Sequence, residues 1–258
     1  MKISEIVIYF LIYSFLGWIL ESVYKTILEK KFINSGFLHS CFCPIYGLAA
    51  LIMLIFLNEY KHNYVLLFVL AFVLLSAWEY VVGALLEKFF KTKYWDYSDK
   101  KINIKGRVCL DNSIAWAVLG FVFIKWLHPF IVSILEKLPT DETLLISIIL
   151  FLGVSIDFII TVIKVCTINI NLKKLSEITE RLKEEMENIK VYASKKTIKN
   201  PKVHKVVEEL KQKQASIKET LYKQTARFRR AFPTMKSEKI TKYLSDRIEA
   251  IKNIKNRR

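Results

Sequence analysis

Residues 64–86 read YVLLFVLAFVLLSAWEYVVGALL, an apolar run in which Glu79 is the one charged residue. About 20 apolar residues suffice for an α-helix to cross the hydrocarbon core of a bilayer. Four further apolar stretches flank this one, at residues 6–24, 43–57, 113–135 and 144–166. The second of them is short and begins beside Pro44. The sequence therefore predicts an all-α, polytopic membrane bundle of about five transmembrane helices.

Charge is segregated along the chain. Residues 1–172 contain 15 Lys and Arg against 13 Asp and Glu, whereas residues 173–258 contain 25 against 11, so the tail holds +14 of the net +16. Together with a positive mean hydropathy, this segregation excludes a single soluble globular domain and a disordered protein. Four cysteines are too few for a secreted disulfide scaffold. We expect a transmembrane domain at 1–170 and a basic, amphipathic helical tail at 171–258.

The basic residues of the connecting segments also predict an orientation. The N-terminus and the loops at 58–63 and 136–143 contain three Lys, while the loops at 25–42 and 87–112 contain ten Lys and Arg. Because Lys and Arg accumulate in cytoplasmic loops, the N-terminus is expected outside and the tail in the cytoplasm. The cysteines then lie at or near the reducing side, where disulfides are not expected.

Four charged residues fall at membrane depth, where an ionisable side chain is costly. Glu21, Glu79 and Asp157 lie 13 to 15 residues from the outer ends of their stretches, or about 20–22 Å at the helical rise. Lys125 comes within about 5 Å of Asp157 in depth, so these two are candidates for an ion pair. Each carboxylate belongs to a stripe of polar or small residues at helical spacing: Ser14, Gly17 and Lys25; Ser76, Gly83 and Glu87; Gly153, Thr161 and Lys164.

We expect these three faces to meet, because small residues allow membrane helices to approach closely. Two interpretations remain open. The carboxylates either hold the interior of the bundle together, or they form a polar site that faces the cytoplasm and binds a cation, a head group or a proton.

The two loops on the expected cytoplasmic side, 36–47 and 94–112, are rich in Gly, aromatic and hydrogen-bonding residues. Aromatic residues at this level are typical of an interfacial belt. Arg107 is expected either to pair with Glu79 or Glu87, or to grip a phosphate or carboxylate ligand. The candidate ligand-binding residues are Glu21, Tyr46, Glu79, Glu87, Trp95, Asp96, Tyr97, Asn103, Arg107 and Asp157.

Metal and catalytic motifs are weak. His39, Cys41 and Cys43, with Cys109 farther along, lack the two-residue gap usual between paired zinc ligands, so neither a metal nor another cofactor is expected. No convincing Ser, His and Asp set is present, and no phosphate-binding loop with its Lys. A role other than catalysis is favoured, although the residues alone do not exclude an enzyme.

The tail has apolar residues at steps of three and four, which predict amphipathic helices. Asn200-Pro201 interrupts them, and a last short helix is expected near 237–254. The helices could form a hairpin or a coiled coil between protomers of a homo-oligomer. The tail lacks a nucleic-acid recognition module, so anionic lipid or self-association is favoured over nucleic acid. The apolar positions are Leu175, Ile178, Leu182, Met186, Ile189, Val203, Val206, Leu210, Ile217 and Leu221.

Several short motifs resemble one bacterial membrane family, that of the ABC-transporter type IV permeases. The resemblance covers roughly residues 6–165, and it implies a transporter membrane subunit in the bacterial inner membrane. The tail residues Arg230, Ala231, Phe232 and Pro233 are also similar to this family. The motifs are FLIYSFLGW at 10–18, Glu21, GFL at 36–38, CPIYG at 43–47, Glu79-Tyr80, WDYS at 95–98, Asn103, Gly106-Arg107 and Cys109-Leu110.

The sequence favours a permease-like or transport-associated subunit with a cytoplasm-facing polar site. Any coupling to ATP would then require a separate ATPase subunit, since this chain lacks the phosphate-binding loop. One alternative is a membrane enzyme that acts on a lipid head group, with a carboxylate near Arg107 as general base. Another is a scaffold or sensor that recruits partners through its basic tail.

Overall fold

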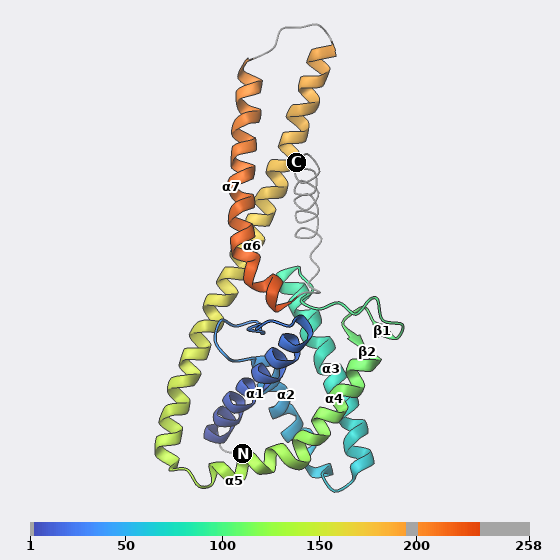
Figure 1. The fold of residues 1–258 in the computed structure, drawn as a ribbon, viewed down its shortest axis with the longest axis vertical. Coiled ribbons are helices and arrows are strands. Elements are labelled where there is room, and N and C mark those ends of the chain that lie inside the picture. Colours follow the sequence, from blue (N-terminus) through green and yellow to red (C-terminus); the bar gives the residue numbers. More distant parts are fainter. Residues whose placement is uncertain (1–2, 195–200, 233–258) are drawn as a thin grey trace. The chain divides into compact units, whose positions relative to one another are not determined.

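The computed structural model describes residues 3–194 and 201–232, and these residues are almost entirely helical (Figure 1). Two short antiparallel strands, β1 (Asn103–Ile104) and β2 (Val108–Cys109), lie in the loop before α4. The helix expected near 237–254 lies outside the described residues. The helices are α1 (Ile3–Glu29), α2 (Pro44–Phe56), η1 (Asn58–Tyr60), α3 (Tyr64–Phe90), α4 (Leu110–Val122), η2 (Phe123–Leu127), α5 (His128–Leu135), α6 (Thr140–Ser194) and α7 (Pro201–Ala231).

Four described segments are long and apolar enough to cross a membrane: Ile3–Glu29, Tyr64–Phe90, Leu110–Leu135 and part of α6. The polytopic helical bundle expected from the sequence is confirmed. The second apolar stretch differs, because it forms the 13-residue helix α2. At 1.5 Å per residue α2 is about 20 Å long, shorter than the hydrocarbon core of about 30 Å.

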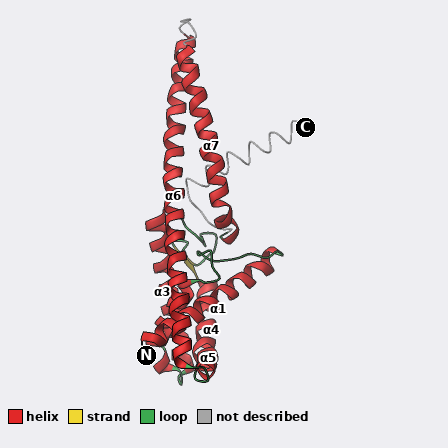
Figure 2. Ribbon diagram, turned by 90° about the vertical axis from the view of Figure 1, so that its left-hand side faces the viewer, coloured by secondary structure: helices red, strands yellow, loops and turns green. Residues whose placement is uncertain are grey.

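The helices pack in pairs, α1 against α2 and α3 against α4 (Figures 1 and 2). Gly17 and Gly47 permit the first pairing, since a Cβ at Gly17 would overlap the Tyr46 side chain and one at Gly47 would overlap Ser14. A buried cluster joins α1, α2, α3 and the turn η2, and Trp116 and Phe121 of α4 pack against it. Many apolar side chains of α6 are exposed, as expected for a lipid-facing surface. The cluster contains Tyr13, Ala50, Met53, Leu54, Leu57, Leu67, Ala71, Leu75, Phe123 and Ile124.

Helices α4 and α5 form one continuous helical segment that contains a π-helical turn, η2. Pro129 explains the turn, because it has no N–H to donate to the carbonyl four residues earlier, that of Lys125. The candidate ion pair between Lys125 and Asp157 does not form among the described residues. The ammonium of Lys125 instead donates to the Lys61 carbonyl at 3.2 Å and lies 4.5 Å from the Tyr64 ring centre.

The loop between α1 and α2 runs back along α1 rather than leaving it. Its acceptors on α1 span 12 residues, or about 18 Å of helix axis, so α2 starts near the middle of α1. This is a segment that re-enters the bundle, and hydrogen bonds to α1 hold part of its polar backbone. Three of its N–H groups donate to successively deeper oxygens: Ile33 to Thr26 Oγ1 (3.1 Å), Ser35 to Ser22 Oγ (3.1 Å) and Cys43 to the Ser14 carbonyl (2.9 Å).

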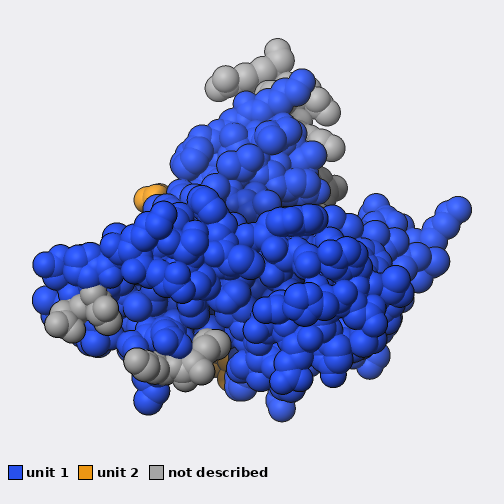
Figure 3. Space-filling view, turned by 90° about the horizontal axis from the view of Figure 1, so that it is seen from below, with its two compact units in different colours: residues 1–162, 230–236 blue, residues 163–229, 237–258 orange. Residues whose placement is uncertain are grey.

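The described residues divide into two compact units (Figure 3). The first contains residues 3–162 and 230–232, and the second contains the rest of α6 and of α7, up to residue 229. In the second unit α6 and α7 form an antiparallel hairpin, in which Asn171 bonds Gln224 and Thr179 bonds Gln214. The sequence left open a hairpin or a coiled coil between protomers, and within the chain these two helices form the hairpin.

The register of α7 differs in detail from the expectation. Val206 is exposed and its neighbour Val207 is buried, because the buried stripe follows a seven-residue spacing through Val207, Leu221 and Phe228. Met186 on α6 is also exposed, whereas Leu175 and Leu182 are buried as expected.

Candidate functional site: a buried carboxylate cluster

Glu21 is held at the contact between α1 and α2. Its Oε2 accepts a hydrogen bond of 2.7 Å from the Tyr46 hydroxyl, and its Oε1 lies 2.7 Å from the ammonium of Lys25, one helical turn later. Tyr46 can reach Glu21 because the missing side chain of Gly17 leaves room for its ring. Both oxygens of Glu21 therefore have a partner.

Glu79 lies in the same region but in different surroundings. It is 7% exposed, and its Oε1 accepts one hydrogen bond, from the Tyr97 hydroxyl at 3.2 Å. Its Oε2 has no hydrogen-bond partner within the described part of the chain. Asn112 and Trp116 of α4 face the same carboxylate, and the Trp116 ring packs edge-on against Tyr46 at 5.7 Å. The expected meeting of the Glu21 and Glu79 faces is thus present, with Tyr46 and Trp116 between them.

Tyr97 closes this cluster from the loop between α3 and α4. Burial raises the pKa of its hydroxyl far above the ordinary value, and the hydrogen bond to Glu79 raises it further. Tyr97 is therefore a neutral hydrogen-bond donor throughout the physiological pH range.

Arg107 pairs with Glu87, one of the two carboxylates expected for it. Its Nε and Nη2 donate to Glu87 Oε2 at 3.0 and 2.8 Å, and its Nη1 donates to the Tyr80 hydroxyl at 3.1 Å. The hydrogen bond to Glu87 raises the pKa of Arg107, so the guanidinium stays charged. With these contacts Arg107 braces the loop against α3.

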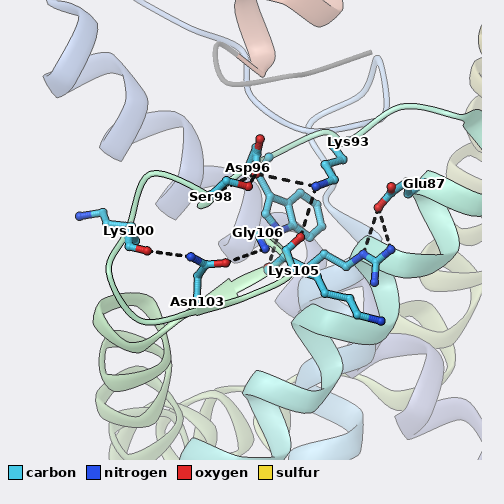
Figure 4. Close-up of polar contacts among 10 residues, drawn as sticks. Glu87, Lys93, Asp96, Ser98, Lys100, Asn103, Lys105 and Gly106 are labelled. Carbon is cyan, nitrogen blue, oxygen red and sulfur yellow. Dashed lines mark hydrogen bonds and ion pairs between the residues drawn. The ribbon is translucent and has the colours of Figure 1, made fainter. Parts of the chain in front are cut away.

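The remaining polar residues of this loop bond mainly to one another (Figure 4). Asn103 donates to the Lys100 carbonyl and accepts from the Gly106 N–H, and Asp96 accepts from Ser98. Gly106 has φ +69°, a left-handed conformation that favours glycine, and a Cβ there would overlap Asp96 and Ser98. The Trp95 indole donates to the Arg107 carbonyl at 2.9 Å and packs beside Gly83. These residues build the loop that places Tyr97.

Replacing Arg107 with Lys is expected to lower the stability of the protein modestly. Lys keeps the charge but loses the paired donors, and we expect a loss of about 1 kcal/mol because the Arg107 side chain is still partly exposed to water. The measurement is thermal unfolding of the purified protein in detergent. Lys100→Ala is the control, because the Lys100–Asp111 pair is fully exposed and its loss should leave the unfolding temperature unchanged. Equal effects of the two substitutions would contradict a bracing role for Arg107.

Asp157 does not join the other two carboxylates but contacts the re-entrant segment. Its Oδ2 accepts from the Ser40 N–H at 2.7 Å and its Oδ1 from the His39 N–H at 3.3 Å. The His39 ring also bonds Thr161, one turn further along α6. Gly153, on the same stripe, has no neighbour within 4 Å of a Cβ placed on it, so that part of the stripe is not a close helix contact.

The end of α7 meets the Glu21 side of the cluster within the first unit. The Lys25 ammonium donates to the Ala231 carbonyl and lies 4.8 Å from the centre of the Phe232 ring. The same ring packs edge-on against Tyr94 at 5.0 Å. Lys25 therefore connects Glu21 with the last described residues of the chain.

Three residues of the carboxylate cluster were not predicted from the sequence. Lys25 was placed on the Glu21 stripe without a role, although its spacing of four residues from Glu21 favours an ion pair. Asn112 and Trp116 were not recognised as neighbours of Glu79. Their spacing of four places them on one face of α4, which was the available signal.

Comparison with known proteins bears on the first unit. The family model described as Putative ABC-transporter type IV matches residues 8–162, which is more than half of the chain. No curated protein and no solved structure gave a match. The matched range includes Glu21, Tyr46, Glu79, Tyr97 and Asp157. On the strength of this match, the chain belongs to the Putative ABC-transporter type IV family.

Proposed function

We propose that this protein is the permease-like membrane subunit of an ATP-driven transporter, with a polar site that opens toward the cytoplasm. The observation that carries the proposal is the re-entrant loop with its short helix α2, which starts near the middle of α1. Non-helical backbone at membrane depth is tolerated where it is buried in protein or lines a cavity, and broken helices of this kind form the substrate sites of many transporters.

The proposed site consists of Glu21, Tyr46, Glu79 and Tyr97. Glu21 and Tyr46 lie where α2 begins, and Tyr97 reaches Glu79 from the neighbouring loop. The Arg107–Glu87 pair and Asp157 serve this site by fixing the two loops. Intramembrane carboxylates that face a bundle interior commonly mark pathways for substrates, ions or protons.

A separate ATPase subunit is the partner that this proposal requires. The test is purification of the tagged protein from native membranes in mild detergent, followed by mass spectrometry of the partners present in stoichiometric amounts. An ATPase subunit that remains bound supports the proposal. A homo-oligomer without an ATPase, or the chain alone, contradicts it.

The proposed orientation places the N-terminus outside and the basic tail in the cytoplasm, where its charge would attract anionic lipid of the inner leaflet. Cys41 tests this orientation, because it is exposed and lies in the re-entrant loop. In a variant with Cys41 as its single cysteine, a membrane-impermeant maleimide should label inverted vesicles and leave intact cells unlabelled. Labelling is measured by the mass shift of the protein.

The matched control is His62→Cys in a chain whose native cysteines are replaced with Ser. Residue 62 is exposed in the loop after α2, which the same orientation places outside. It should be labelled in intact cells. Reversal of the two results would invert the orientation.

A further inference from the structure

Glu21 and Glu79 face the same cluster from different surroundings. Glu21 is 22% exposed at its side chain, and both of its oxygens are occupied by the donors Lys25 and Tyr46. One of these donors is a cation, the ammonium of Lys25 one helical turn away.

In the described part of the chain, Glu79 has no cation beside it. Its side chain is 7% exposed, the Tyr97 hydroxyl donates to it at 3.2 Å, and Asn112 and Trp116 of α4 are further neutral donors that face the carboxylate. Its second oxygen has no partner of good hydrogen-bond geometry among the described residues. A negative charge buried among neutral groups is disfavoured, whereas a protonated carboxyl group bears no net charge.

The groups that face Glu79 supply no positive charge. They come from each element packed around it, and none of them is a cation. Arg107 is bonded to Glu87, about two helical turns after Glu79 on α3, and to Tyr80, the residue next to Glu79. Lys25 is paired with Glu21. The facing groups are Glu21 from α1, Tyr97 from the loop, and Asn112 and Trp116 from α4. Tyr46 of α2 packs against Trp116, and Cys109 of β2 lies near Tyr97.

We infer that Glu79 is a proton-binding site, at which the ligand is a proton held on the side-chain carboxyl group. Binding adds one proton to a carboxylate oxygen of Glu79, and release returns that proton and leaves a negative charge. This inference deepens the proposed function by naming the ligand of the site, but it does not depend on an ATPase partner.

The test uses the full-length protein purified in detergent, and it reads the proton directly. Infrared spectra are recorded from about pH 5 to about pH 9, a range that lies above the ordinary carboxyl pKa of about 4, so that an ordinary carboxyl group is ionised throughout it. A protonated carboxyl group has a C=O stretching band that ionisation removes. We expect such a band near neutral pH in the unmodified protein, and we expect Glu79→Gln to abolish it.

Dicyclohexylcarbodiimide gives a second and independent readout, because this apolar reagent adds to protonated carboxyl groups in apolar surroundings. Mass spectrometry should locate the adduct on Glu79 near neutral pH, with at least a tenfold lower yield on Glu21. Glu59→Gln, at an exposed carboxyl group outside the proposed site, should leave both the band and the adduct in place. Tyr97→Phe, which removes a donor to the ionised form, should make the band persist to higher pH.

Two results would overturn the inference. One is an infrared spectrum near neutral pH that is identical in the unmodified protein and in Glu79→Gln. The other is a protein whose adduct forms on Glu21 and not on Glu79. Both readouts are made on the isolated chain, so they can succeed even where the search for an ATPase partner fails.

Discussion

Gly47→Ala is expected to destabilise the membrane domain strongly, unlike Gly153→Ala. A Cβ at this position would overlap Ser14 Oγ and lie 2.5 Å from the backbone carbonyl oxygen of Phe10. A flexible side chain could move aside, but the backbone of α1 cannot yield without separating α1 from α2. Overpacking of this kind costs about 3 kcal/mol, the upper end of the usual range. Thermal unfolding in detergent should show a fall of about 6–12 °C for a chain of this size.

Gly153→Ala is the matched control for that experiment. It adds the same methyl group to a helical glycine, yet nothing lies within 4 Å of the added atom. Replacing Gly with Ala inside a helix removes backbone freedom from the unfolded chain, so stability should stay the same or rise slightly. The contact between α1 and α2 would be looser than described if both variants unfolded at the same temperature as the unmodified protein.

Apolar length was enough to predict most of the bundle from the sequence, because a span of about 20 apolar residues has few alternatives to a membrane helix. Apolar length is a weaker guide at residues 43–57, which form the short helix α2 after the loop from α1 has re-entered the bundle. That path depends on the side-chain oxygens of Ser22 and Thr26, which accept the loop N–H groups, and on Gly17 and Gly47. Such contacts join residues far apart in sequence, so periodicity does not reveal them.

The candidate site was predictable only in part. Depth along the helices brought Glu21 and Glu79 to one level, and the structure joins them through Tyr46 and Trp116. Depth also suggested a pair between Lys125 and Asp157. It failed there because depth says nothing of the direction in which a side chain points. The long stem of Lys125 carries its charge toward Tyr64 and the Lys61 carbonyl, at the start of α3.

Asp157→Ala is expected to release the re-entrant loop from α6. The carboxylate accepts two backbone N–H groups, from Ser40 and His39, and its side chain is 16% exposed. Hydrogen bonds to a charged group contribute about 1.5–3 kcal/mol each, so the loss should be about 3 kcal/mol or more. Asp157→Asn should have an intermediate effect, since the amide retains one acceptor oxygen.

Two measurements on the same samples separate loosening of this loop from general unfolding. The rate at which a maleimide modifies Cys41, the residue next to Ser40, should increase in Asp157→Ala at a temperature where the helical content is unchanged. Ser155→Ala is the control, because the Ser155 hydroxyl bonds only the Phe151 carbonyl of its own helix. An unaltered Cys41 rate in Asp157→Ala would mean that the α1 contacts hold the loop by themselves. The carboxylate at 157 would then need an explanation other than loop anchoring, because an ionisable residue at membrane depth is costly to keep.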